Sequence, residues 1–374
     1  MKEEHTLRAV LCALQTEGTD EESFERSVRE LCGLSEACGV EVCTVVTQRL
    51  ASPVHATYIG SGKLAELKAA CDMLDAELAV FDESLSPTQI RNLSGELSVE
   101  VIDRTDLILR IFSDRAKTKE ARLQVEYARL SYMLPRLVGM RAHLSRQGGA
   151  SGFMSARGAG ETRLELDRRK ILDRQARLRK ELKNVERIRH TQRASRLGGG
   201  LLRVGLVGYT NAGKSTLMNR LLAMSSGVKK EVYTEDMLFA TLDTTVRRIE
   251  VYGHAPFLLS DTVGFISHLP TMLIDAFRST LAEAADADLL LEVVDCTDED
   301  RDAQSEVTVQ TLKEIGAGHI ARIRVMNKAD MEGALHPPGT LLCRHPEGEA
   351  DEIYISARTG EGVDALLARI EGHA

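Results

Sequence analysis

The stretch GYTNAGKST, residues 208–216, restricts what this chain can fold into more than any other feature. It fits the pattern G-x-x-x-x-G-K-[ST] and follows the apolar run LLRVGLVG directly. Glycine at both ends allows a tight turn and a close approach to phosphate oxygens, which N–H groups at a helix N-terminus then bind. The pattern predicts a strand, a phosphate-binding loop and a helix. The residues expected to contact a nucleotide here are Gly208, Tyr209, Thr210, Asn211, Ala212, Gly213, Lys214, Ser215 and Thr216.

Two side chains of this loop have separate predicted roles. Lys214 places a cation against the β and γ phosphates, and the hydroxyl of Ser215 is a ligand for Mg²⁺. The cofactor that this chemistry implies is Mg²⁺, bound together with a nucleoside di- or triphosphate.

Two later segments come in the order that a guanine-nucleotide switch needs. In FATLDTT, residues 239–245, Thr241 can reach both Mg²⁺ and the γ-phosphate. In DTVG, which follows the apolar segment FLLS, Asp261 is expected to hold Mg²⁺ through water and the Gly264 N–H to bind the γ-phosphate. Their neighbours expected in the same site are Phe239, Ala240, Thr262 and Val263.

Two loops near the C-terminus carry groups that select guanine. Asp330, in NKAD after the strand RIRVM, can accept hydrogen bonds from N1 and N2 of guanine, a pair that adenine lacks. Asn327 is expected to bridge the base and the phosphate loop, and Lys328 to stack under the ring. In SARTGEG, residues 356–362, the Ala357 N–H is expected to meet the guanine carbonyl, flanked by Ser356 and Arg358.

The residue after the switch glycine is Phe265, where a water-orienting glutamine is common in such switches. Because phosphoryl transfer depends on positioning and charge stabilisation, its absence slows hydrolysis without forbidding it. We therefore assign catalysis to Lys214, Thr241 and Gly264, and expect a low intrinsic rate that a polyanionic partner raises. The candidates within this chain for a charge-stabilising arginine are Arg247, Arg248 and Arg278, and the alternative for each is an ordinary surface arginine.

Charge is strongly segregated along the chain. The net charge is -8, but residues 101–200 hold 24 basic and 11 acidic side chains, a local charge of +13. A basic region within an acidic protein indicates a site for a polyanion. The alternative to a binding site is a solvent-exposed helical face whose arginines only keep the protein soluble.

The same region predicts a helical hairpin over 113–198. Two apolar series recur every seven residues, which gives each of two helices one apolar seam. Five glycines in 147–160 predict a flexible tip between the helices, Pro135 predicts a kink in the first, and GGG at 198–200 ends the second. The two series are Leu123, Leu130, Leu137 and Leu144, then Leu164, Ile171, Leu178 and Val185.

Residues 1–112 alternate between strand-like and helix-like segments. Strands are predicted at 44–50, 78–84 and from 99, with helices at 20–32 and 63–75, which favours a small, mostly parallel sheet. The turn IGSGK at 59–63 is read as a plain turn, with a phosphate or RNA contact by Lys63 as the minor alternative. The chain is thus an α/β protein with three parts, the last being a nucleotide-binding domain over 199–374 with a mainly parallel six-strand sheet.

The cysteine content and the N-terminal sequence indicate the cellular compartment. Seven scattered cysteines without a C-x-x-C pair indicate reduced thiols, and the charged N-terminus does not resemble a secretory signal. No apolar run is long enough to cross a bilayer. We expect a cytoplasmic monomer.

Several segments together resemble the HflX family of translation-associated GTPases. They are GYTNAGKST, FATLDTT, DTVGFISHLP, NKAD, GAGETRLELDRR at 158–169, YIGSGKLAELK and VFDESLSPTQIRNL. The resemblance implies GTP hydrolysis stimulated by the large ribosomal subunit, and splitting or rescue of stalled ribosomes. It also implies that the hairpin tip reaches towards the peptidyl-transferase region. Candidate contacts to ribosomal RNA are Arg157, Arg163, Arg168, Arg169 and Lys63.

Two other functions stay open at this point. The same nucleotide domain would serve a GTPase that assists ribosome assembly or RNA metabolism. It would also serve a switch that docks on a protein or, peripherally, on an anionic membrane. The narrow apolar seams lack the aromatic residues that anchor interfacial helices, which argues against the membrane.

Overall fold

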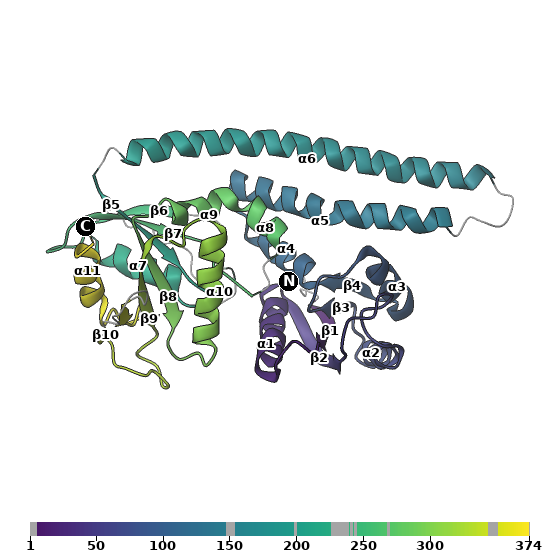
Figure 1. The fold of residues 1–374 in the computed structure, drawn as a ribbon, viewed down its shortest axis with the longest axis horizontal. Coiled ribbons are helices and arrows are strands. Elements are labelled where there is room, and N and C mark those ends of the chain that lie inside the picture. The colour runs from purple at the N-terminus through teal and green to yellow at the C-terminus, as the bar shows by residue number, and fades with distance from the viewer. Residues whose placement is uncertain are drawn as a thin grey trace, which may run out of the picture. The chain divides into compact units, whose positions relative to one another are not determined.

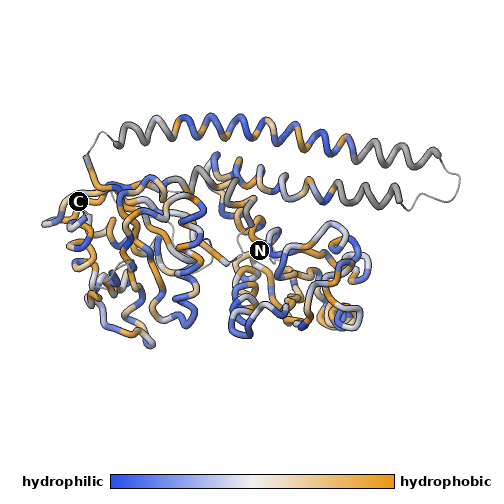
Figure 2. The backbone as a smooth tube through the Cα atoms, viewed as in Figure 1, coloured by the Kyte–Doolittle hydropathy of each residue, from blue (hydrophilic) through white to orange (hydrophobic). Residues whose placement is uncertain are grey.

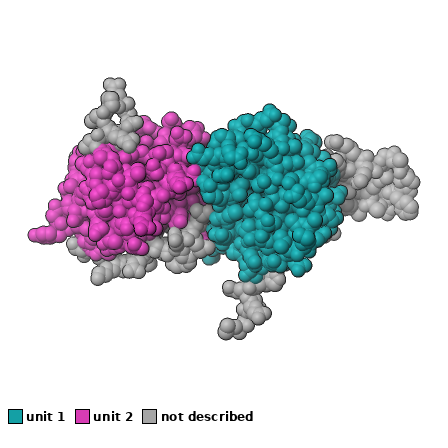
Figure 3. Space-filling view, turned by 90° about the horizontal axis from the view of Figure 1, so that it is seen from below, with its two compact units in different colours: residues 1–114, 122–184 teal, residues 115–121, 185–374 magenta. Residues whose placement is uncertain are grey.

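The computed structural model describes residues 6–146, 154–197, 200–225, 239, 242, 245–267, 270–342 and 351–373. The chain divides into two compact units (Figure 3). Unit 1 comprises residues 1–114 and 122–184, and unit 2 comprises residues 115–121 and 185–374. None of the described helices is long and apolar enough to cross a membrane.

The first part of unit 1 is a parallel sheet of four strands in the order β2-β1-β3-β4 (Figure 1). Its strands are β1 (Leu7–Gln15), β2 (Val40–Arg49), β3 (Leu78–Phe81) and β4 (Glu100–Asp103). Its helices are α1 (Glu21–Ala37), α2 (Ser61–Met73), α3 (Pro87–Leu97) and α4 (Arg104–Arg115). The parallel sheet is confirmed, but the predictions omitted β1 and α3.

The central strand β1 has a core on both of its faces. Val10, Cys12 and Leu14 pack in a cluster with residues of α2 and α3, while the alternate residues Ala9 and Leu11 are also fully buried. A strand buried on both faces reads as a continuous apolar run without alternation. The segment LRAVLCALQ therefore lacks the alternating pattern of a half-buried strand.

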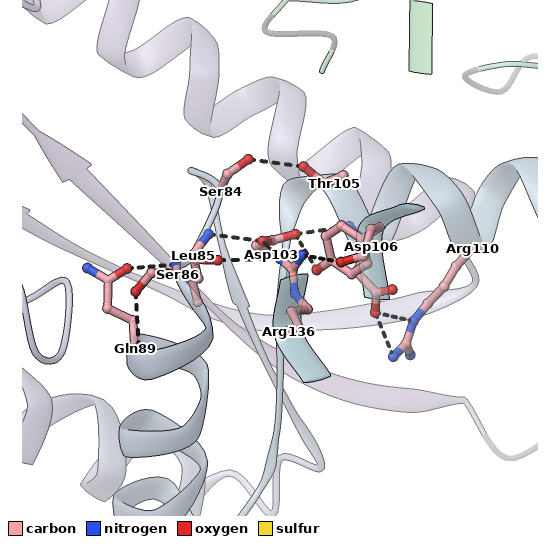
Figure 4. Close-up of polar contacts among 10 residues, drawn as sticks. Ser84, Leu85, Ser86, Gln89, Asp103, Thr105, Asp106, Arg110 and Arg136 are labelled. Atoms are coloured by element: carbon pink, nitrogen blue, oxygen red, sulfur yellow. Dashed lines mark hydrogen bonds and ion pairs between the residues drawn. The ribbon is translucent and has the colours of Figure 1, made fainter. Parts of the chain in front are cut away.

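A buried carboxylate at the end of β4 connects this sheet to the first helix of the predicted hairpin. Asp103 has no exposed surface, and its two oxygens accept from the backbone N–H groups of Leu85 and Asp106, at 2.9 and 3.0 Å. They also accept from the Tyr132 hydroxyl at 2.7 Å. The Arg136 guanidinium donates to Asp103 at 2.7 Å as well (Figure 4). Since Tyr132 and Arg136 belong to α5 (Lys119–Arg146), the carboxylate fixes this helix on the sheet.

Helix α5 and helix α6 (Met154–Leu197) form the predicted antiparallel hairpin. The Arg174 guanidinium donates to both oxygens of Glu126, at 2.6 and 2.7 Å, and Gln175 donates to Ser131 at 2.9 Å. Of the apolar seam residues, Leu178 is fully buried. Hydrophilic colours dominate the described middle of α6 (Figure 2).

The glycine-rich tip is shorter than predicted. Residues 147–153 lie outside the described part, but residues 154–160 already belong to α6. Each of the two glycines in MSARGAG costs about 1 kcal/mol relative to alanine, which the neighbouring helix formers and the length of the helix outweigh. At the other end α6 stops at Leu197, next to the predicted glycine terminator. Pro135 lies inside α5, and the predicted kink there stays a prediction.

Unit 2 contains a sheet of seven strands in the order β10-β11-β9-β8-β5-β7-β6. Its strands are β5 (Leu202–Val207), β6 (Thr245–Ile249), β7 (Phe257–Asp261), β8 (Leu289–Asp295), β9 (Ala321–Asn327), β10 (Leu341–Leu342) and β11 (Glu352–Tyr354). Only β6 and β10 run antiparallel to their neighbours. The α/β class is confirmed, and the predicted count of six strands is wrong because the two-residue β10 adds a seventh.

Helices cover both faces of this sheet. One core cluster includes Leu217, Leu221 and Leu366, and a second includes Leu281 and Leu312, so α7 and α11 pack on one face and α9 and α10 on the other. The helices of unit 2 are α7 (Lys214–Met224), α8 (Thr271–Ala276), α9 (Arg278–Ala285), α10 (Arg301–Glu314) and α11 (Val363–Glu371). Between the two faces, the carboxyl ends of β5, β7, β8 and β9 meet at one edge, where open α/β sheets bind ligands.

Candidate nucleotide-binding site

The loop after β5 has the predicted shape. Gly208 has φ +135°, and a Cβ atom there would lie 2.3 Å from the carbonyl oxygen of Val293 in the adjacent strand. Gly213 has φ +94° and a Cβ atom there would lie 2.2 Å from Nδ2 of Asn327. Both positions therefore exclude any side chain. Helix α7 starts immediately afterwards at Lys214, so its N-terminal N–H groups face the loop.

Lys214 is buried and bends back over the loop. Its ammonium donates to the carbonyl oxygens of Gly208 at 3.1 Å and Tyr209 at 2.6 Å. Burial lowers the pKa of Lys214 to about 8, and the nearby Asp261 carboxylate partly opposes this shift. Phosphate oxygens would replace these two carbonyl oxygens as acceptors when a nucleotide binds.

A hydroxyl and a carboxylate meet beside this lysine. Ser215 donates from Oγ to Oδ2 of Asp261 at 2.9 Å, and Asp261 is fully buried at the end of β7. Both groups are hard oxygen ligands of the kind that Mg²⁺ prefers, and Mg²⁺ usually takes only one or two protein ligands besides water and substrate phosphates.

Only some of the remaining predicted switch residues belong to the described part of the chain. Ala240 and Thr241 lie outside the described residues, while Phe239 is described and buried. The Thr262 hydroxyl donates to the Leu206 carbonyl inside the sheet at 2.6 Å, and the neighbouring Val263 is buried as well. Their side chains therefore hold the segment in the fold and leave the backbone to face the loop.

The segment after Asp261 returns to the phosphate loop. Tyr209 and Phe265 form a parallel bridge, with Thr210 N–H donating to the Phe265 carbonyl at 2.9 Å. Gly264 lies against Thr210, because an added Cβ would come within 2.8 Å of its Cγ2. The structure thus brings the predicted γ-phosphate amide next to the loop.

Asn327 holds the two halves of the site together. Its Nδ2 donates to the Ala212 carbonyl in the phosphate loop, and its Oδ1 accepts from the Ala357 N–H, each at 2.9 Å. The bridge from Asn327 to the phosphate loop is as predicted. The Ala357 amide thus donates to Asn327 in the structure, and its predicted contact with the guanine carbonyl stays a prediction.

Asp330 lies in the loop after β9 among groups that keep it ionised. A hydrogen bond from Ser356 and an ion pair with Arg358, at 2.6 Å, lower the pKa of the Asp330 carboxyl. The adjacent Lys328 has φ +65° and pairs with Asp295 at 2.7 Å. A charged acceptor beside a lysine stem is the arrangement that recognition of guanine needs.

One residue that the sequence did not point to holds the base loop. Arg220 of α7 donates from Nε to the Ala357 carbonyl at 3.1 Å and from Nη2 to the Arg358 carbonyl. It links the helix that starts at the phosphates to the loop near the base. No local motif marks it, because its partners lie more than 130 residues away.

The predicted RNA contacts lie on helices. Arg168 and Arg169 are in α6, each about one helical turn from Glu165, at 3.5 Å from its carboxylate. Arg157 and Arg163 belong to the same helix, but their side chains lie outside the described part. Lys63 is in α2 and pairs with Glu66 at 2.7 Å. IGSGK is therefore the start of a helix and not a free turn.

The catalytic arginine candidates have other partners or are not described. Arg248 of the edge strand β6 pairs with Glu250 at 2.5 Å, and Arg247 donates to the Val246 carbonyl at 3.3 Å. The Arg278 side chain lies outside the described part.

Three family models match this sequence in succession. They are described as GTP-binding GTPase N-terminal over residues 25–113, GTP-binding GTPase Middle Region over 115–196, and 50S ribosome-binding GTPase over 203–328. The predicted division into three parts stays a prediction.

Individual relatives match almost the whole chain. A GTPase HflX from Caldanaerobacter subterraneus subsp. tengcongensis is 44% identical over 97% of this chain and 80% of its own length. One from Spirochaeta thermophila is 46% identical over 97% and 84%. The chain belongs to the HflX family of GTPases. The resemblance drawn from the motifs is confirmed, and the site described above belongs to an enzyme that hydrolyses GTP.

One further HflX relative agrees with this, and one solved structure shares the fold. The GTPase HflX of Escherichia coli (strain K12) is 42% identical over 92% of this chain and 79% of its own length. A crystal structure of SsGBP in complex with GDP gives a TM-score of 0.51 over 97% of both chains at 24% identity, which shows the fold alone.

Proposed function

We propose that this HflX family GTPase is a cytoplasmic translation factor that binds the large ribosomal subunit and splits or rescues stalled ribosomes. GTP is the substrate, Mg²⁺ the cofactor and ribosomal RNA the surface that it contacts. The observation that carries the ribosomal part is the exposed basic surface of α6.

Exposed basic side chains recur along the described part of the helix, where exposed acidic residues such as Asp173 and Glu186 are fewer. The exposed basic residues are Arg169, Lys170, Arg174, Arg177, Arg179, Lys180, Lys183 and Arg187. RNA is a dense polyanion, and neutralising its phosphates releases counterions, which drives binding. The match to a family described as 50S ribosome-binding GTPase supports the same partner.

The nucleotide site supports the following roles. Main-chain N–H groups of residues 208–216 and the Lys214 ammonium bind the phosphates, and Asp330 selects guanine. Ser215, Asp261 and Thr241 would hold Mg²⁺, which neutralises charge on the phosphate oxygens when it is bound. Thr241 and the Gly264 N–H would contact the γ-phosphate, so that GTP favours the ribosome-bound form and hydrolysis releases it.

Hydrolysis in this chain needs help from its partner. Phe265 has no polar side-chain group and is 1% exposed, so it cannot orient a water molecule. Binding to the large subunit can order the switch segments and position the attacking water or a cation. The free protein should therefore turn over slowly.

The decisive experiment compares GTP turnover by the free protein with turnover in the presence of small subunits, large subunits and whole ribosomes. We expect large subunits and whole ribosomes to raise the rate at least tenfold, and small subunits to leave it unchanged. Equal rates with and without large subunits would refute the proposal. Stimulation by small subunits alone would favour a role in subunit assembly.

A parallel binding experiment separates RNA from membranes. The protein is mixed with ribosomal large subunits or with anionic lipid vesicles and sedimented at increasing salt. We expect salt-sensitive binding to the subunits and none to the vesicles. Preferential binding to the vesicles would instead support a switch that docks on a membrane.

A further inference from the structure

The segment that follows the switch glycine is bonded to the phosphate loop on both sides of one residue. Thr210 N–H donates to the Phe265 carbonyl at 2.9 Å, and Phe265 N–H donates to the Gly208 carbonyl at 3.1 Å. These two bonds form the parallel bridge between Tyr209 and Phe265. The backbone beside Gly264 is thus held as a short extra strand against the loop.

A tyrosine hydroxyl fastens the same segment two residues further on. The Tyr209 hydroxyl accepts a hydrogen bond from the Ser267 N–H at 2.8 Å, and it shares a second with Ser267 Oγ at 2.7 Å. The Tyr209 side chain is buried. Together, the contacts that join residues 208–210 to residues 265–267 are called the loop–switch bridge below.

The phenylalanine anchors the bridge from its other side. The Phe265 side chain packs in an apolar cluster with Val207, Leu281, Leu290 and Leu312. A glutamine in this place would bury an amide among apolar side chains, which is costly without hydrogen-bond partners. The apolar residue therefore fits a segment held down on the sheet and does not fit one that swings out to orient water.

We propose that Tyr209 is a positioning residue. Its hydroxyl holds the Gly264 amide in the place where that amide contacts the γ-phosphate. Such switch segments are commonly ordered by the γ-phosphate itself. Here the phosphate loop supplies part of that order in advance through the loop–switch bridge. The inference rests on the proposed role of Gly264, and it assigns the tyrosine no contact with the reacting atoms.

The test removes only the hydroxyl, in Tyr209→Phe. Affinity for a non-hydrolysable GTP analogue and for GDP is measured, together with the single-turnover rate of GTP hydrolysis. Because two hydrogen bonds are lost, we expect about tenfold weaker binding of the analogue and about tenfold slower hydrolysis. GDP affinity should stay within about twofold, since GDP has no γ-phosphate.

Matched variants isolate the hydroxyl. Tyr252→Phe removes a hydroxyl from a side chain that is 98% exposed and should change none of these quantities. Ser267→Ala keeps the backbone N–H donor, so its effect should be smaller than that of Tyr209→Phe. The double variant should lose no more analogue affinity and no more hydrolysis rate than Tyr209→Phe alone, because Tyr209→Phe already removes the hydrogen bond between the two hydroxyls.

The outcomes distinguish failure of the bridge from failure of the site. Equal losses for GDP and the analogue in Tyr209→Phe, or no loss for either, would overturn the role of the hydroxyl. Lys214→Ala is measured alongside, and if it binds nucleotide like the original protein, the site assignment and the inference both fail.

Discussion

At the scale of single residues, Lys214 couples nucleotide binding to pH. Burial lowers its pKa from 10.5 to about 8, so the folded protein releases this proton at a lower pH than the unfolded chain. Between about pH 8 and 10.5 the unfolded chain holds more protons, and this lysine makes the fold more stable as pH rises. Phosphate binding has the opposite preference, since it needs the charged ammonium.

Nucleotide affinity should therefore fall above pH 8. Each unit of pH beyond the lysine pKa should weaken GDP binding by up to about tenfold, because binding must then take up one proton. The measurement is a titration with GDP from pH 7 to about pH 8.5, because N1 of guanine itself begins to ionise near pH 9. Lys214→Arg stays charged throughout and should give a flat profile. Identical slopes for the two proteins would contradict this role of Lys214.

The charge of Asp330 is expected to determine which base the site binds. In Asp330→Asn, the carboxylate that accepts from N1 and N2 of guanine becomes an amide. One of the two acceptor oxygens is replaced by an NH2 group, and the remaining oxygen loses its charge. Since a hydrogen bond to a charged group contributes roughly 1.5–3 kcal/mol, GTP binding should weaken at least about tenfold. Xanthosine triphosphate, which has a carbonyl in place of the amino group, should bind better than before. Competition between the two nucleotides measures the shift, and unchanged guanine preference would show that Asp330 does not read the base.

The sequence predicted the positions of these residues but not all their partners. The loop 208–216, Asp261 and Asn327 occur in local patterns whose spacing reflects one turn or one strand end. The contacts of Arg220 with residues 357 and 358, and of Tyr209 with Ser267, join segments far apart in sequence. Only the register of the folded sheet brings them together, so no local pattern could reveal them.

At the scale of elements, the Asp103 carboxylate decides how α5 sits on the N-terminal sheet. It accepts four hydrogen bonds, two from loop and helix N–H groups and two from side chains of α5. Both Tyr132 and Asp103 are buried, so these bonds form away from water. Burial and, after it, the nearby Asp103 carboxylate raise the pKa of Tyr132 far above its usual value, which keeps the phenol a donor.

Asp103→Asn should destabilise unit 1 by about 3–5 kcal/mol, because the amide leaves the Arg136 charge uncompensated and turns a donor towards donors. Urea unfolding followed by circular dichroism measures the loss. Asp167→Asn, which removes an exposed carboxylate paired with Lys170, is the control and should change stability by less than about 0.5 kcal/mol. Equal midpoints for both variants would show that Asp103 does not anchor the helix.

Elements were predicted where one physical signal dominated. The seven-residue apolar series gave both long helices, and alternating strand and helix signals gave a parallel sheet. Strand β1 was missed because burial on both faces removes the alternation. The glycines of residues 154–160 were read as a break, although the flanking helix formers carry α6 through them.

At the scale of the whole molecule, a GTPase site and a basic helical surface lie in one chain of acidic net charge. The α/β fold and the family follow from ordered motifs, and the basic surface from charge segregation. What couples the surface to the site depends on the partner, which one chain does not contain. The large ribosomal subunit is the partner that we propose.

The most direct test of this coupling is the GTP hydrolysis rate with saturating large subunits in a charge-reversed variant, Arg168→Glu with Arg169→Glu. Arg26→Glu with Arg29→Glu, on α1, makes the same charge change elsewhere and is the control. We predict that the α6 variant loses at least tenfold of the stimulation and keeps the rate of the free protein, while the control retains both. Full stimulation of the α6 variant would contradict the account.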